Sequence, residues 1–458
     1  MTAYRTSTPS RAAGADPGAA RSTSADAQGS DAAAMIERQR ASIFPCVKPL
    51  YDQPLVLVGA EGVRARGADG REYLDLFAGI LTTSIGHCHP RVVAAVQGQV
   101  ARLGHTSNLY VTEPYVAAAE RLIGLAPAGL NQVMFTNSGT EAIETAVMLA
   151  QMHTRRSEII GLRLGYSGRS TLATSLTGQA QWKPLPATAP VRHAIAPYPY
   201  RHADGHNVDR YIDELVEVIE TTTTGRPAAL LAETIQGVGG YIVPPPGYHA
   251  RAAEVIRAYG GVFICDEVQA GFGRTGDRWF GIEHWEVEPD IMVVAKGVAN
   301  GFPVGGTLAR EEIAAAWTGL TFSTYGGSPV SMVAARATMD VMVEENTPSR
   351  SAERGRQMRE GLEALQRDYP WIGDVRGMGL MIALELVEDP GTKEPSAKLG
   401  KALLEAAREE GVLIGLGGMG GHVIRIGPSM LITREDVAEG LERLGRACAR
   451  VEAGRQAA

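Results

Sequence analysis

The stretch "GGVFICDEVQAGFGRTG", residues 260–276, contains a short apolar run that ends on two adjacent carboxylates, Asp266 and Glu267. A compact run of this kind, bounded by glycine, is typical of a strand buried in a sheet. A charge at the end of such a strand needs a partner, because its desolvation is costly. In open α/β sheets, ligands gather at the carboxyl ends of the strands, so Asp266 marks a candidate binding site.

Similar apolar runs occur on both sides of this stretch and alternate with amphipathic helical patterns such as "RVVAAVQGQVARL" and "EPYVAAAERLIGLA". This alternation predicts an α/β fold with a mainly parallel sheet covered by helices. The other runs that we predict as strands are "QVMFT" (132–136), "EIIGL" (158–162), "AALLAE" (228–233) and "DIMVVAK" (290–296).

The two ends of the chain predict a second, smaller domain. Residues 55–77 alternate short apolar runs with Gly and Asp turns, which is typical of an antiparallel meander. From residue 331 onward, long helical patterns mix with short strands, which predicts an α+β domain. The expected organisation is a disordered leader (1–34), a meander that joins the small domain (35–80), a large domain (81–330) and a C-terminal small domain (331–458).

The composition is that of an ordinary soluble globular protein, with 45% hydrophobic and 21% charged residues. No apolar stretch approaches the length of a bilayer span. The net charge of −7 is modest and spread along the chain, which favours small-molecule partners over nucleic acid. The four cysteines are scattered without a CxxC pair, as expected of reduced thiols. The leader lacks the apolar block of a secretory signal and carries acidic residues that argue against an organelle transit segment, so we expect a cytoplasmic protein.

Two further strand ends carry residues that fit one cofactor. "TNSGTE" (136–141) places small residues at a helix N-terminus, where free N–H groups can hold a phosphate, although Ser138 could equally cap the helix. "DIMVVAK" ends on Lys296, which either reaches the surface or, if desolvated, becomes an amine nucleophile for carbonyls. With a carbonyl cofactor on Lys296, Asp266 could hold a protonated ring nitrogen. The cofactor implied is pyridoxal phosphate.

These segments together resemble the class III aminotransferases, which are fold-type I pyridoxal-phosphate enzymes. The matching segments lie in family order between about residue 40 and residue 445, and "GHCHPRV" is most similar to the alanine–glyoxylate branch. The resemblance implies a seven-stranded sheet in the large domain. The segments include "LFAGILTTSIGHCHP" (76–90), "TNSGTEAIETA" (136–146), "CDEVQAGFGRTG" (265–276), "PDIMVVAKGVANGFPVG" (289–305) and "STYGGSP" (323–329).

The resemblance implies roles for the residues that surround the cofactor ring. Lys296 would be the Schiff-base lysine and proton shuttle, and Asp266 the partner of the pyridine nitrogen. Gln269 would hydrogen-bond the ring hydroxyl, Glu233 would lie near that network, and Tyr166 would stack on the ring face.

It also implies a phosphate site and a substrate site. Ser138, Gly139 and Thr140 would bind the phosphate. Thr324 would reach the phosphate of the neighbouring subunit, which implies a homodimer with active sites at the interface. Arg425 would bind a substrate carboxylate through its planar fork, unless it is an ordinary surface arginine.

The chain departs from the family pattern at three positions. Ser167 stands where the family usually has histidine. Val238 stands where ornithine and 4-aminobutyrate enzymes carry a glutamate that can mask the arginine, so Arg425 would stay unmasked. Ser328 replaces the usual asparagine, a variant that resembles the phospho-lyases of the same family.

Three other features are expected to be structural. Glu267 points away from Asp266 on an extended segment and is expected to pair with an arginine such as Arg274. The cluster "GHCHP" (86–90) has no second ligand pair and is expected to be a structural loop. "GLGGMG" (415–420) precedes a strand pattern rather than a helix, so we expect a flexible loop near Arg425 and no dinucleotide site.

The residues therefore favour an aminotransferase that moves an amino group from an amine or amino acid, with an ω-amino donor, to a 2-oxo acid such as pyruvate, glyoxylate or 2-oxoglutarate. The first alternative is a lyase that eliminates phosphate or another β substituent from an amino-alcohol phosphate. The second alternative is a non-catalytic protein of the same fold or a dinucleotide oxidoreductase. Lys296, Asp266 and Gln269 occur together, which argues against a decayed site.

Overall fold

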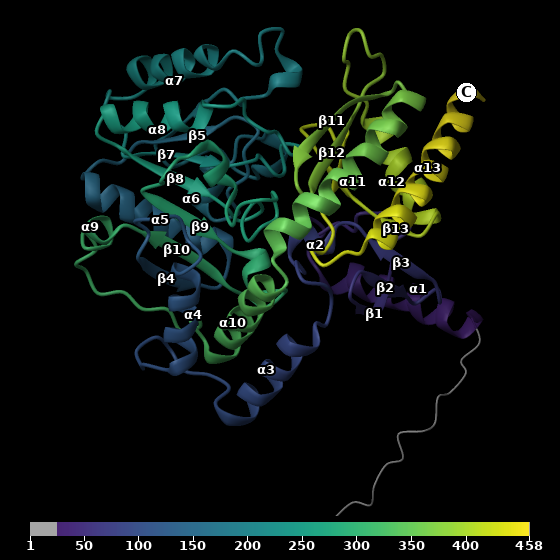
Figure 1. The fold of residues 1–458 in the computed structure, drawn as a ribbon, viewed down its shortest axis with the longest axis horizontal. Coiled ribbons are helices and arrows are strands. Elements are labelled where there is room, and N and C mark those ends of the chain that lie inside the picture. Colours follow the sequence, from purple (N-terminus) through teal and green to yellow (C-terminus); the bar gives the residue numbers. More distant parts are fainter. Residues whose placement is uncertain (1–24, 458) are drawn as a thin grey trace, which may run out of the picture.

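The computed structural model describes residues 25–457, which form a large α/β part and a smaller α+β part (Figure 1). Residues 1–24 of the expected disordered leader lie outside the described residues. The rest of that leader was predicted wrongly, because residues 25–34 belong to helix α1 (Ala25–Ser42). Its alanine-rich sequence has a high helix propensity. No helix among residues 25–457 is both long enough and apolar enough to cross a membrane.

A seven-stranded sheet forms the centre of the large part. Strand β10 is antiparallel to both of its neighbours, and all other pairs in the sheet are parallel. The prediction of a mainly parallel sheet is therefore confirmed, and each of the five apolar runs forms one of its strands. In spatial order the strands are β4 (Gln132–Thr136), β10 (Gly305–Ala309), β9 (Ile291–Val294), β8 (Val262–Asp266), β7 (Ala229–Glu233), β5 (Ile159–Leu162) and β6 (Val191–Ala194).

Helices cover both faces of this sheet, as the apolar strand runs require. In β8, Val262 and Ile264 join the core on one face, whereas Phe263 and Cys265 join the core on the other. This alternation follows from the two-residue repeat of a strand. One face packs against α5 (Gly139–Thr154), α6 (Thr171–Leu176) and α9 (Glu311–Ala314). The other packs against α4 (Glu113–Ile123), α7 (Val208–Thr222), α8 (Tyr248–Ala258) and α10 (Pro329–Glu344), with α3 (Pro90–Arg102) on α10.

Two strands of the sheet, β6 and β10, lack an apolar run, so the sequence pattern did not reveal them. Strand β6 lies at the edge of the sheet and carries Arg192 and His193. Strand β10 begins with Gly305 because a Cβ there would lie 2.2 Å from the carbonyl oxygen of Ser138. A glycine in a strand often marks such a close approach of two backbones.

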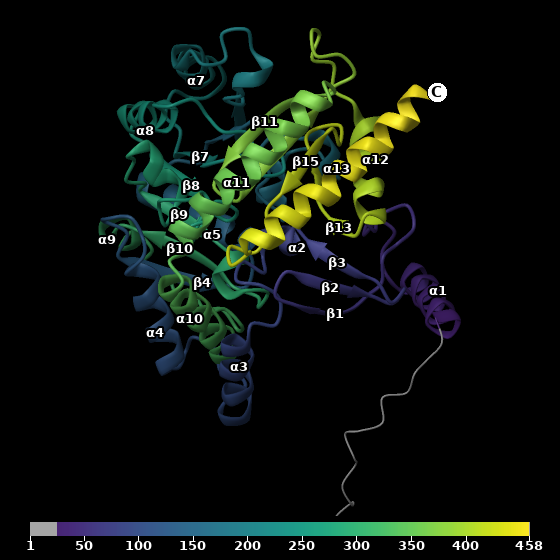
Figure 2. The same cartoon turned by 45° about the vertical axis from the view of Figure 1, so that its right-hand side comes forward.

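The smaller part combines both ends of the chain around one hydrophobic core. Figure 2 shows the N-terminal meander beside the C-terminal helix α13 (Arg434–Gln456), and strand β3 (Glu72–Asp75) pairs in parallel with β13 (Val412–Leu413). One sheet contains β1 (Leu57–Glu61), β2 (Arg64–Gly67), β3 (Glu72–Asp75) and β13 (Val412–Leu413). The other contains β11 (Ile372–Met378), β12 (Met381–Leu386), β15 (Val423–Ile426) and β14 (Gly415–Gly417). The helices are α11 (Thr347–Asp368), α12 (Ala397–Glu409) and α13 (Arg434–Gln456).

The long helix α10 differs from the expected domain boundary at residue 331. Its buried side chains, such as Met332 and Met339, belong to the core of the large part, and it packs against α3 and α4. The two cores therefore divide after Glu344. The expected boundary was wrong because a helical pattern does not show which sheet the helix covers. The short elements that remain are α2 (Ala78–Leu81) and 3-10 turns at Ala180–Trp182, Pro199–Arg201, Gly281–Trp285 and Lys296–Ala299.

Candidate active site

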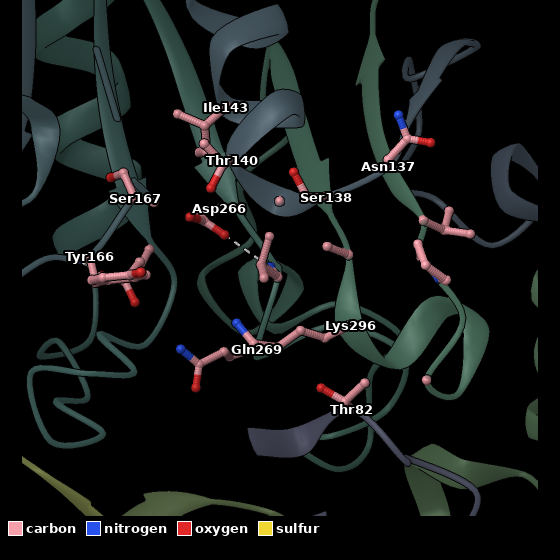
Figure 3. A pocket seen from close by; sticks show the side chains of 18 of the residues that line it. Thr82, Asn137, Ser138, Thr140, Ile143, Tyr166, Ser167, Asp266, Gln269 and Lys296 are labelled. Carbon is pink, nitrogen blue, oxygen red and sulfur yellow. Dashed lines mark hydrogen bonds between the residues drawn. The ribbon is translucent and has the colours of Figure 1, made fainter. Parts of the chain in front are cut away.

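A cavity of about 320 Å³ lies at the carboxyl ends of strands β7, β8 and β9 (Figure 3). It brings together side chains from turns that are far apart in the sequence. Thr324 and Arg425 are the two predicted site residues that do not line it. The predicted residues that do are Ser138, Gly139, Thr140, Tyr166, Glu233, Asp266, Gln269 and Lys296.

The turn between β4 and α5 has both properties that its sequence suggested. Ser138 caps α5, because its Oγ accepts a hydrogen bond of 3.2 Å from the N–H of Glu141. The first N–H groups of a helix lack partners within the helix, and those of Gly139 and Thr140 lie at the cavity. The backbone of Gly168 lies close to this turn, since a Cβ at Gly168 would lie 2.3 Å from Oγ1 of Thr140. The turn is therefore a cradle suited to an anion.

Lys296 follows the end of β9, and its side chain extends into the cavity (Figure 3). Its backbone has a φ of +48°, a left-handed conformation that is costly for a residue with a side chain. Burial lowers the pKa of the ammonium, Asp266 and Glu233 oppose this effect, and Arg425 adds to it. Its side chain is half-buried and lines the cavity, so Lys296 is a partly desolvated amine rather than a lysine on the outer surface.

Two carboxylates, Asp266 and Glu233, lie side by side, because β7 and β8 pair them directly. Burial raises the pKa of Asp266 to about 6, opposed by the N–H of Val268 and by Lys296. Burial and the neighbouring Asp266 raise the pKa of Glu233 to about 8. Glu233 accepts hydrogen bonds from the N–H groups of Tyr166 at 2.9 Å and Gly237 at 2.7 Å. Each carboxylate would be stabilised by a cation in the cavity.

The raised pKa of Glu233 predicts a pH dependence of stability. The folded chain holds a proton on Glu233 that the unfolded chain loses near pH 4.5, so stability falls as the pH rises toward about 8. We expect the melting temperature of the cofactor-free protein to decrease between about pH 6 and about pH 8. The decrease should be smaller in Glu233→Gln, and equal slopes in both proteins would contradict this assignment.

Gln269 and Tyr166 complete the surroundings of the cavity. The Oε1 atom of Gln269 is buried and has no hydrogen-bond partner among residues 25–457. A Cβ at Gly237 would lie 2.1 Å from Nε2 of Gln269, so a larger residue at position 237 would displace the amide. Tyr166 lies on the opposite side of the cavity from Lys296 in Figure 3, and its ring makes a T-shaped contact with that of Trp182.

These groups fit the cofactor that the resemblance implies. A desolvated amine, a buried carboxylate, an amide oxygen without a partner and an anion cradle match an aldehyde, a cationic ring nitrogen, a hydroxyl and a phosphate. Each of these matches pairs a group that is costly to bury alone with one of opposite character.

Glu267 corrects one expectation. It does not pair with Arg274, whose guanidinium instead donates to the carbonyls of Leu380 and Pro428. Glu267 accepts from Oγ1 of Thr234 at 2.6 Å and from two N–H groups at the start of the turn Gly281–Trp285, at 3.0 and 2.7 Å. Burial raises its pKa to about 7, opposed by these hydrogen bonds. It is structural, as expected, but it is held by neutral donors.

Replacement of Glu267 by alanine should therefore reduce stability. Three buried donors would lose their acceptor, which costs about 3 kcal/mol or more in the free energy of unfolding. Chemical denaturation of Glu267→Ala measures this loss, with the exposed Glu312→Ala as control. Equal stability of the two variants would show that the hydrogen bonds of Glu267 contribute little.

Arg425 lies on β15, close to the cavity but outside its lining. Its guanidinium is buried, Nε donates to the carbonyl of Leu416, and Nη1 has no partner among the described residues. No carboxylate within residues 25–457 forms an ion pair with it. Val238 stands close by, since a Cβ at Gly417 would lie 2.9 Å from Nε of Arg425 and 3.2 Å from the carbonyl oxygen of Val238. The motif at 415–420 is not a flexible loop throughout, because its first three residues form β14 beside β15.

Hydrogen bonds to Asp75 order the histidine-rich loop. His87 hydrogen-bonds Asp75 at 2.8 Å, and the other oxygen of Asp75 accepts from the N–H groups of Phe77 and Ala78. Within the part of the chain that the structure describes, no group of His, Cys, Asp and Glu side chains could hold a metal ion.

Sequence reasoning missed several residues that line the cavity. Thr82 lines the cavity from the segment that follows the meander. In the sequence this segment is far from every strand end of the large sheet, so no strand pattern points to it. Ile235 and Val268 line it next to the polar residues, but apolar side chains near strand ends carry no distinctive signal. Ser167, one of the departures from the family pattern, also lines it, and its N–H donates to Oγ1 of Thr177.

Comparisons with known proteins agree with this geometry. The family model of class III aminotransferases matches residues 47–448. An alanine–glyoxylate aminotransferase 2 homologue of Arabidopsis thaliana is 40% identical over 409 residues, which cover 89% of this chain and 86% of that protein.

Solved structures are similar over nearly the full length. An amine transaminase from an uncultivated Pseudomonas species, in its pyridoxal-phosphate-bound form, is 32% identical, with a TM-score of 0.84 over 89% of this chain and 98% of that chain. A phospholyase from Arthrobacter in complex with phosphoethanolamine is 29% identical, with a TM-score of 0.84 over 91% of this chain and 99% of that chain. The family match, the identities and the fold together show that this chain belongs to the class III aminotransferases, which are pyridoxal-phosphate-dependent enzymes of fold type I.

Proposed function

We propose that this aminotransferase takes its amino group from an ω-amine or ω-amino acid and delivers it to a 2-oxo acid such as pyruvate, glyoxylate or 2-oxoglutarate. The observation that carries the proposal is Arg425, a buried guanidinium with a free Nη1 whose charge is felt at Lys296. A guanidinium binds a carboxylate in a planar, two-point fashion, which suits the carboxylate common to these acceptors.

Val238 supports the same reading. Its side chain is apolar, so it cannot pair with Arg425 as a glutamate at this position could. The guanidinium therefore stays available for an acid at every stage of the reaction. We propose that the ω-amino donor is chosen by other contacts in the cavity.

Within the cavity, each residue has a role that its surroundings support. We propose that Lys296 binds the cofactor aldehyde, that Asp266 faces the ring nitrogen, and that Gln269 and Glu233 face the ring hydroxyl. The phosphate would lie at the cradle formed by Ser138, Gly139 and Thr140, and the ring against Tyr166. When bound, pyridoxal phosphate supplies an electron sink for the negative charge that develops at the substrate carbon.

Lys296 is also the proposed proton carrier. Burial lowers the pKa of its Nζ, so a larger fraction of the amine is neutral at a given pH than for an exposed lysine. A neutral amine can accept a proton from the substrate carbon and return it to another atom. The nearby carboxylates, Asp266 and Glu233, stabilise the charged amine between these two events.

We also propose that the enzyme acts as a homodimer. Two neighbouring segments expose large apolar side chains, and the N–H of Ser323 joins them by donating to Oδ1 of Asn108 at 3.2 Å. An exposed apolar patch of this kind fits a subunit interface. Thr324 lies within it and is exposed, which suits contact with a phosphate in the other subunit. The exposed side chains are Leu109, Tyr110, Val111, Leu320, Phe322 and Tyr325.

One observation favours a second function, the elimination of phosphate from an amino-alcohol phosphate. Ser328 precedes α10, and its side chain makes no capping hydrogen bond, so the hydroxyl is free for another partner. The structural similarity to the phospholyase bound to phosphoethanolamine is of the same order as that to transaminases. Arg425 favours the transferase, because such a substrate has no carboxylate.

A half-reaction separates these functions. The cofactor-loaded enzyme is mixed with 4-aminobutyrate, alanine or phosphoethanolamine without any oxo acid, and carbonyl product, phosphate and ammonia are measured. We expect a single equivalent of carbonyl product per site, with further turnover only after pyruvate is added. Continuous release of phosphate and ammonia without an oxo acid would overturn the proposal in favour of the lyase.

A further inference from the structure

We propose that Tyr241 is a positioning residue for oxo-acid recognition, because the guanidinium of Arg425 lies over both its ring and that of Phe77. This inference rests on the proposed function, in which Arg425 binds the substrate carboxylate. The carbon Cζ of Arg425 lies 5.0 Å from the centroid of the Phe77 ring and 5.8 Å from that of Tyr241. Both distances fall within the range of cation–π contacts. We call these two rings the aromatic clamp.

The glycine-rich strand β14 gives the clamp its space. A Cβ at Gly415 would lie 2.2 Å from Cε2 of Phe77, and a Cβ at Gly417 would lie 2.9 Å from Cδ and Nε of Arg425. Alternate residues of a strand share one face, so these two glycines open the face on which both side chains lie. This explains the glycines at 415 and 417, which resemble a nucleotide motif in sequence only.

Tyr241 occupies its position at a conformational cost. Its φ of +51° is unusual for a residue with a bulky side chain. The tight loop from Gln236 to Ile242 imposes this conformation, with two hydrogen bonds between those end residues of 3.1 and 3.2 Å. The ring is fully buried, and its hydroxyl has no partner among the described residues. Strain of this kind persists where the surroundings require it, often at binding sites.

The same loop connects the clamp to both parts of the molecule. Glu233, which lines the cavity, accepts from the N–H of Gly237 at one end of the loop. Near the other end, Nε of Arg376 donates to the carbonyl of Gly240 at 2.9 Å. Arg376 is held in turn by Asp374 and by the buried Glu385 on β11 and β12. The loop therefore fixes the position of Tyr241 relative to β15, which carries Arg425.

The clamp stabilises the buried guanidinium of Arg425 without occupying its N–H groups, which an acidic partner would occupy. A buried guanidinium needs compensation for lost hydration, and two ring faces supply part of it. A carboxylate partner would supply more, but it would compete with the substrate for the same N–H groups. Two rings leave Nη1 free, as observed. The clamp therefore keeps Arg425 in place and available in the absence of an acid at position 238.

The test compares Tyr241→Leu with Tyr241→Phe in the cofactor-loaded enzyme. Leucine removes the ring, and phenylalanine keeps it, so we expect KM for pyruvate to rise about tenfold in the first and to stay unchanged in the second. The half-reaction with 1-phenylethylamine, a donor without a carboxylate, should be unchanged in both variants. The split between KM for the acid and the rate with the amine separates positioning of Arg425 from a general loss of structure.

Either of two results with the Tyr241 variants would overturn the clamp. An unchanged KM for pyruvate in Tyr241→Leu would show that the ring does not position Arg425. An equal rise in Tyr241→Phe would assign the effect to the hydroxyl instead. If Tyr241→Leu does not fold, Gly415→Ala displaces the Phe77 ring and should raise KM for pyruvate selectively, and an unchanged KM there would also refute the clamp.

Arg425→Leu distinguishes failure of the inference from failure of the proposed function. A large rise in KM for pyruvate in Arg425→Leu, with none in Tyr241→Leu, would refute the clamp alone. An unchanged KM in Arg425→Leu would refute the carboxylate role of Arg425 and the clamp with it.

Discussion

Replacement of Lys296 by alanine is expected to reduce amino transfer by about 10³-fold or more, since it removes both a nucleophilic amine and a proton carrier. Lys296 is the lysine that lines the cavity, and its pKa is lowered by burial, so no other side-chain amine lining the cavity can take its place. The steady-state rate with an amine donor and pyruvate measures the loss. The absorption of the bound cofactor should change as well, because its link to the protein is gone.

The exposed Lys398→Ala serves as the matched control and should keep wild-type activity. Lys296→Arg should be as inactive as the alanine variant, because a guanidinium keeps its proton at any usual pH. Partial recovery of Lys296→Ala by added methylamine would further support the role of the amine. An alanine variant with activity close to that of the wild type would show that another group performs the chemistry.

Replacement of Asp266 by asparagine is expected to lower the rate by about 100-fold or more, as the loss of a preorganised electrostatic contact does. The two side chains have nearly the same shape, so the change removes charge and little else. In the wild type, the Oδ1 atom of Asp266 also accepts from the N–H of Val268 at 2.9 Å, and asparagine can keep this hydrogen bond. Stopped-flow measurement of the half-reaction isolates the chemical step.

The neighbouring carboxylate provides the contrast. Glu267→Gln changes the charge one residue away but lies outside the cavity lining, so it should lower stability and leave the turnover per folded molecule unchanged. If both variants lose the same activity, a general effect of buried charge would explain the result. If Asp266→Asn alone is as active as the wild type, the carboxylate has no electronic role.

Local sequence patterns predicted most of the sheet and most of the cavity. The run from Val262 to Cys265 is apolar on both faces, and such a run has few alternatives to a buried parallel strand. Polar or small residues directly after such runs lie at one edge of the sheet, so Ser138, Asp266 and Lys296 come together by topology alone.

The sequence pattern failed where contacts with segments far away in the chain decide the local structure. Strand β10 lacks an apolar run because Gly305 must pass close to Ser138, and helix α10 covers the large sheet although its sequence would suit either part. Glu267 was expected to seek an arginine, but hydroxyl and backbone donors from distant segments satisfy it. None of these contacts lies within reach of a local periodicity.

The sequence by itself determined the strand ends, the roles expected of Lys296 and Asp266, and the family, because each depends on residue types at short spacing. Only the tertiary structure decided how Arg425 is held, since its surroundings come from Phe77, Tyr241 and the glycines of β14, which are far apart in the chain. It also decided the pKa shifts of Asp266 and Glu233: burial raises both, and the pairing of β7 with β8 places the charge of Asp266 beside Glu233, whose pKa it raises further. Burial and proximity are properties of the folded packing, so no short stretch of sequence carries them.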